Sequence, residues 1–253
     1  MQSKFLKLIF IIFLCVFFFF LILSNAPATW VAWGIHKAAP NVWLTGASGS
    51  LWRGSAETSQ VDINNSPIAL GTISWNISPW SFLRLSACMD IEAVAPGQSV
   101  SGHVCQSISG RTSLSDVSVE LPIARLQSLL PTAVVGHLSL QIQSAKVSNQ
   151  RFSELDGQVN LQQTRISVEN TWYSFGTFAA KLSESQAGGV DAKLFDIDSP
   201  YKFDLNATWL IGEPWRIAGV ITPQASAPEL AVQALQTIGE DAGSGGYRVQ
   251  WPL

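Results

Sequence analysis

Two cysteines and a histidine lie close together in the sequence, at Cys88, His103 and Cys105. Thiolates and imidazoles are common zinc ligands, but a structural zinc site takes four ligands and these residues offer three. Two cysteines in an oxidising compartment form a disulfide instead. The sequence is therefore compatible with a disulfide or with a three-ligand metal site. The way in which the segments around Cys88 and Cys105 pair distinguishes the two.

The spacing of the two cysteines predicts that they face each other in a β-hairpin. Cys88 lies eight positions before Pro96 and Cys105 lies eight positions after Gly97, so a two-residue turn at Pro96-Gly97 places them directly opposite. Opposed antiparallel residues have Cα atoms about 4.5 or 5.5 Å apart, which a disulfide tolerates. The same register puts His103 opposite Asp90. We therefore predict a Cys88–Cys105 disulfide and no metal centre.

The sequence carries none of the common catalytic or cofactor motifs. Residues 46–49 read Gly-Ala-Ser-Gly and lack the second spacer of the esterase nucleophile elbow. The glycine run at 243–246 is not followed by the Lys-Ser/Thr pair of a phosphate-binding loop. We predict a protein that is not an enzyme and binds no cofactor.

Trp52 and Arg53 form an aromatic and cationic pair inside a glycine-rich stretch. Gly46, Gly49 and Gly54 disfavour a helix, and they predict a short strand over residues 51–53 between turns. Tryptophan and arginine are enriched in the parts of protein interfaces that dominate binding. The pair is a candidate interface, and the alternative is a buried tryptophan beside a surface arginine.

Apolar and polar residues alternate with a period of two over most of the chain after residue 42. This period is typical of half-buried strands in an antiparallel sheet. The clearest runs are residues 73–77, 83–91, 138–142, 155–161, 201–209 and 215–221. Two segments instead have helical spacing: Pro122–Leu130, with proline near its start, and Pro228–Ile238, which Gly239 ends.

An apolar segment near the N-terminus predicts a membrane anchor. Residues 5–24 are almost entirely apolar, long enough for a helix to cross a hydrocarbon core of about 30 Å. Lys4 and Lys7 precede or begin this segment, which favours a cytoplasmic N-terminus. The alternative is a signal peptide cleaved after Ala26, but Pro27 would follow the cut and the apolar region exceeds the usual length.

These patterns define a domain plan. We expect a cytoplasmic tail at residues 1–4, a transmembrane helix at 5–24, an exported linker with interfacial Trp30 and Trp33 at 25–41, and an exported β-rich domain at 42–253. The predicted fold is mainly β: an N-terminal transmembrane helix followed by an extended, curved antiparallel β-sheet with two short helices.

The charge of the exported part limits its partners. Without Lys4 and Lys7 the chain has 13 basic and 18 acidic side chains, a net charge of −5. This sign disfavours nucleic acid and a polybasic attachment to anionic lipid.

Four short blocks of the sequence resemble the protein N family of the bacterial type II secretion system. The most specific is Gly49-Ser50-Leu51-Trp52-Arg53-Gly54, which follows an N-terminal anchor and a tryptophan-containing segment. The others are residues 71–75, residues 114–122 and the final strand at 246–251. The Cys88/Cys105 pair is not part of the family pattern.

The resemblance implies a bitopic inner-membrane component of the apparatus that exports folded periplasmic proteins through the outer membrane. Other components of that system would be its partners. An AsmA-like lipid-handling module, with an apolar β-groove that holds acyl chains, is the alternative, and lipid would then be a ligand. The two differ in whether the apolar face is a closed core or an open groove.

Overall fold

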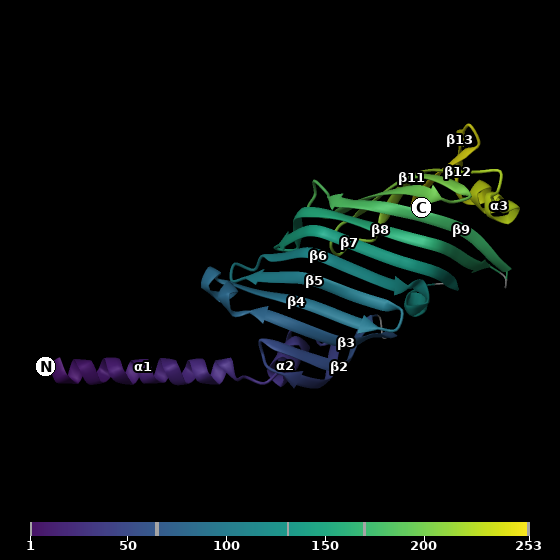
Figure 1. The fold of residues 1–253 in the computed structure, drawn as a ribbon. Helices are drawn as coiled ribbons and strands as arrows, with labels where there is room; N and C mark the ends of the chain where they lie inside the picture. Colours follow the sequence, from purple (N-terminus) through teal and green to yellow (C-terminus); the bar gives the residue numbers. More distant parts are fainter. Residues whose placement is uncertain (1, 64–65, 131, 169–170, 252–253) are drawn as a thin grey trace.

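The computed structural model describes residues 2–63, 66–130, 132–168 and 171–251. The strands of this part of the chain form one 14-stranded, curved sheet (Figure 1). Strand order follows the sequence from β1 to β12 and ends with β14 and β13. Neighbouring strands are antiparallel, from β1 paired with β2 to β13 paired with β14. The predicted extended antiparallel sheet is confirmed.

The elements have the following bounds. The strands are β1 (Val42–Gly49), β2 (Arg53–Ile63), β3 (Ser66–Ser78), β4 (Ser86–Ala95), β5 (Gln98–Ser107), β6 (Thr112–Pro122), β7 (Val134–Ser148), β8 (Arg151–Val168), β9 (Thr171–Glu184), β10 (Val190–Asp198), β11 (Tyr201–Trp209), β12 (Arg216–Pro223), β13 (Glu240–Gly243) and β14 (Gly246–Trp251). The helices are α1 (Gln2–Ser24), α2 (Thr29–Ala38), η1 (Pro79–Arg84), η2 (Ile123–Leu129) and α3 (Glu229–Ile238), of which η1 and η2 are 3₁₀ helices.

Directly paired apolar residues form a continuous row across one face of the sheet. Because successive side chains in a strand point to opposite faces, the alternating sequence pattern places such residues on one side. Ala93 and Leu205 in this row are buried and the other members are half-buried. In strand order the row is Ile73, Ala93, Val100, Val119, Leu140, Val159, Ala180, Leu194, Leu205, Gly219 and Val249.

Short helices pack against the two edges of the sheet (Figure 1). Ala28 and Val31, at the start of α2, form a buried cluster with Ala56 and Trp75. At the other edge α3 carries buried Leu235. The helices therefore cover some of the apolar side chains near the two edges, while the row between them is only partly shielded.

The sequence predictions missed two short helices and misplaced two strand boundaries. Residues 25–41, predicted as a linker, contain α2, and the strand predicted at 83–91 begins at Ser86 because η1 occupies the residues before it. Residues 51–52, predicted to lie in a short strand, form the turn between β1 and β2. The helices predicted at Pro122–Leu130 and Pro228–Ile238 correspond to η2 and α3.

The N-terminal helix α1 extends away from the sheet (Figure 1). Phe10, Phe13, Phe18 and Phe19 are each more than half exposed. Residues 5–9, 16 and 20 of the predicted span have side chains outside the described set. Within the part of the chain that the structure describes, no helix has both the length and the apolarity needed to cross a membrane. The transmembrane span at 5–24 stays a prediction.

Candidate functional site

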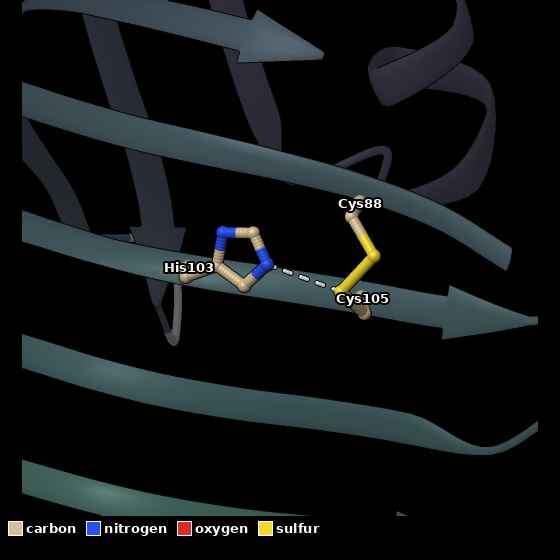
Figure 2. Close-up of side chains that lie close together, drawn as sticks. All are labelled: Cys88, His103 and Cys105. Carbon is tan, nitrogen blue, oxygen red and sulfur yellow. Dashed lines mark hydrogen bonds between the residues drawn. A yellow bond between two sulfur atoms is a disulfide. The ribbon is translucent and has the colours of Figure 1, made fainter. Parts of the chain in front are cut away.

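The hairpin of β4 and β5 brings the two predicted cysteines together. Ala95 pairs with Gln98 across the Pro96-Gly97 turn, and Cys88 pairs with Cys105. The two sulfur atoms are bonded at 2.03 Å, with the Cα atoms 4.0 Å apart (Figure 2). The structure has the register from which the disulfide was inferred.

His103 lies beside this disulfide on the same face (Figure 2). Its Nε2 is 3.2 Å from Cys105 Sγ, and its Nδ1 is 2.6 Å from Asp90 Oδ1. The possible ligand atoms of Cys88, His103 and Cys105 lie within 4.8 Å of one another. Cysteine binds zinc as a thiolate, and here the two sulfur atoms are bonded to each other. In this state the group is a disulfide with a neighbouring histidine.

Hydrogen bonds connect this disulfide to Arg53, the second predicted site. Arg53 Nε donates to Asn76 Oδ1 at 3.1 Å, and Asn76 Nδ2 donates to Asp90 Oδ2 at 3.5 Å. Asp90 then bonds His103, which contacts Cys105. The steps from Arg53 to His103 join directly paired residues on adjacent strands from β2 to β5, and the step from His103 to Cys105 stays within β5. We call these five side chains the polar ladder.

Trp52 attaches the end of α1 to the sheet. Its indole Nε1 donates to the carbonyl oxygen of Leu23 at 3.0 Å. The ring meets Phe82 of η1 edge-on, with centroids 6.0 Å apart. These three residues, with Ser24 and Pro79, line an apolar cavity of about 300 Å³. Trp52 is half-buried between the two helices, while Arg53 is exposed.

A second apolar cavity lies under α3, at the other edge of the sheet. It has a volume of about 270 Å³, and aromatic and aliphatic side chains line it: Tyr173, Phe175, Tyr201, Phe203, Ile221, Leu230, Ala231, Ala234 and Leu235. Tyr201 is 1% exposed, and its hydroxyl has no hydrogen-bond partner among the described residues. Burial raises the pKa of the Tyr201 phenol.

Sequence reasoning missed several members of these sites. Asp90 was predicted opposite His103, but Asn76 is an ordinary polar position of an alternating strand, and its role appears only when β3 pairs with β2 and β4. Phe82 was hidden because η1 was not predicted. The proline at the start of η1, Pro79, was the available signal for a helical turn.

Comparison with known proteins gives one family. The sequence model described as "Type II secretion system (T2SS), protein N" matches residues 40–250. No curated protein and no solved structure matches the chain significantly. The comparisons give no support to the AsmA-like alternative.

Proposed function

The chain belongs to the protein N family of the type II secretion system, and from this we propose that it is a bitopic inner-membrane component of that system. Its N-terminus lies in the cytoplasm, residues 5–24 cross the membrane and residues 42–253 lie in the periplasm. It supports the export of folded periplasmic proteins through the outer membrane without catalysing a reaction. The observation that carries the proposal is the family match over nearly all of the sheet.

The residues at the start of the chain support the proposed topology. Lys4 and Lys7 are the cations nearest the apolar segment, and cations favour the cytoplasmic side. Trp30 and Trp33 of α2 are 52% and 66% exposed, and Lys37 Nζ lies 5.7 Å from the centre of the Trp33 ring. Exposed tryptophans shortly after an apolar helix are typical of a membrane interface.

The partners are other components of the same system, and the Arg53 end of the polar ladder is the surface at which we propose they bind. Arg53 is exposed, yet its bond to Asn76 holds the guanidinium in place. A positioned arginine is suited to an interface because little side-chain entropy remains to be lost on binding.

Deleting the gene tests the export role. We expect the exported proteins to accumulate folded in the periplasm and to be released again when the full chain is supplied. Normal release from the deletion strain would contradict the proposal.

A photo-crosslinking amino acid at position 53 tests the interface in intact cells. We expect it to capture a component of the secretion system. The same group at Lys202, an exposed strand position on β11, is the control and should capture none. Equal capture at both positions would remove Arg53 as the interface.

A further inference from the structure

Five apolar side chains project from the strand ends next to α1. They come from η1, from the residue that follows it and from the turn after β5. We call them the apolar tip: Trp80 (75% exposed), Phe82 (49%), Leu83 (77%), Leu85 (64%) and Ile108 (78%). The backbone N–H of Ile108 donates to the carbonyl oxygen of Leu85 at 3.1 Å, so the two turns form one surface.

Hydrogen bonds and the disulfide hold this tip in place from below. Ser81 Oγ donates to the Ser78 carbonyl at 2.6 Å and accepts from the Cys88 N–H at 3.0 Å. Cys88 is bonded to Cys105, three residues before Ile108. The backbone that carries the exposed side chains is therefore held in place by hydrogen bonds and by the disulfide.

The backbone at Leu85 points to a role outside folding. Its φ is +56°, in the left-handed region, and it ends η1. Glycine and asparagine are the usual residues at such helix ends. A leucine there is strained, and 64% exposure means that burial in the fold does not compensate. Glycine could end η1 in the same way without this strain, and strained residues of this kind cluster at functional positions.

The tip lies beside the end of α1. Phe82 contacts the Trp52 ring, and Trp52 bonds the carbonyl of Leu23 near the end of that helix. Pro79 and Phe82 of η1 line one apolar cavity together with Leu23 and Ser24 of α1. If Ser24 lies where the anchor leaves the membrane, the tip is at the depth of the lipid headgroups and upper acyl chains.

The composition of the tip favours lipid over protein as the occupant. Tryptophan and phenylalanine concentrate at membrane interfaces, and leucine and isoleucine enter the acyl region. Arg84 and Arg111 flank the tip and are exposed, where they suit lipid phosphates. We propose that the apolar tip inserts into the periplasmic leaflet of the inner membrane as a second attachment beside α1. This inference rests on the anchoring proposed above.

Tryptophan quenching by brominated lipids tests the insertion. The full chain is reconstituted into vesicles of phosphatidylethanolamine and phosphatidylglycerol whose acyl chains carry bromine. We expect the Trp80→Phe substitution to remove a measurable part of the quenching. The control is Trp172→Phe, because Trp172 is 48% exposed and lies at the opposite ends of the strands. This control should leave the quenching unchanged.

Extraction with alkaline carbonate separates failure of the inference from failure of the proposed function. Chain that resists extraction and loses quenching only with Trp80→Phe supports the insertion. Chain that resists extraction with equal quenching in both variants overturns the insertion and leaves the anchor intact. Chain that is extracted overturns the anchor and the insertion together.

Discussion

Two short helices, η1 and α3, have similar apolar composition but differ in how far their apolar side chains are buried. Both consist largely of apolar residues and both lie where the chain leaves the sheet. In α3, Leu235 is 8% exposed and covers the cavity over Tyr201 and Phe203, whereas in η1, Leu83 is 77% exposed. The difference comes from their positions, since α3 lies on the apolar face and η1 projects beyond the strand ends. Apolar composition alone does not say which helix is part of the core.

Placing a charge in each helix tests this contrast and should give the largest effect. Leu235→Asp buries an unpaired carboxylate and leaves a void, and we expect it to reduce the free energy of unfolding by about 4 kcal/mol. Leu83→Asp should change it by less than about 0.5 kcal/mol, because the side chain is already in solvent. Thermal unfolding in detergent measures both. Equal losses would show that η1 also contributes to a core.

The disulfide beneath η1 has no counterpart at α3. Cys105→Ser opens a link between residues 17 positions apart, and we expect a loss of about 3 kcal/mol in the free energy of unfolding on the chain-entropy model. Cys15→Ser is the control, since Cys15 is a free thiol and should cost little.

Thiol labelling provides a second measurement of the same link. Wild-type chain unfolded without reductant should label at Cys15 alone. If Cys88 and Cys105 also react, the disulfide is absent in the cell.

Removing the Tyr201 hydroxyl, in the cavity under α3, should stabilise the protein. Tyr201→Phe removes a buried hydroxyl without a partner among the described residues, and we expect a gain of about 1 kcal/mol. Tyr173→Phe, in the wall of the same cavity, should be close to neutral. A loss of stability in Tyr201→Phe would mean that the hydroxyl is satisfied, for example by an ordered water.

The pH dependence of stability provides a check on the same residue. Burial raises the pKa of Tyr201, so the folded chain keeps the phenol neutral while the unfolded chain ionises at about pH 10. The contribution of Tyr201 to the free energy of unfolding is therefore fully present below about pH 10 and is lost as the pH rises from there through the higher pKa of the folded state. Tyr201→Phe should weaken this alkaline loss, and an unchanged alkaline loss in this variant would contradict the assignment to Tyr201.

Apart from the control variants and Leu83→Asp, a substitution at Leu85 should give the smallest change in stability. Leu85→Gly relieves the left-handed backbone at the end of η1, and we expect a gain of about 0.5 kcal/mol after the greater flexibility of unfolded glycine is subtracted. The same variant should reduce lipid quenching of Trp80. A stability loss would show that the leucine packs within the fold after all.

The sheet was predictable because alternation is a local property of the sequence. The pairing of Cys88 with Cys105 was predictable for a similar reason, since a two-residue turn connects adjacent strands and sets their register. The residue at which β4 starts was not predictable from the alternation. Leu83 and Leu85 continue the alternation of the strand, and the pattern does not reveal that these two residues lie before it.

The polar ladder required information that no single segment contains. Arg53 and Asn76 are brought together by the pairing of β2 with β3, which contains register shifts near Ser59. Such irregularities change which residues oppose each other without leaving a clear mark in the sequence. Alternation assigns the faces of a strand, but it does not identify the partners across the sheet.

The order of the strands has a consequence for how the chain folds as it is made. From β1 to β12 each strand pairs with the next one in sequence, so each hairpin can form once its second strand has emerged. A chain that emerges N-terminus first can therefore begin to fold before its later segments have appeared. Contacts between residues near in sequence also favour rapid folding. The sheet can therefore grow outward from its N-terminal edge one strand at a time.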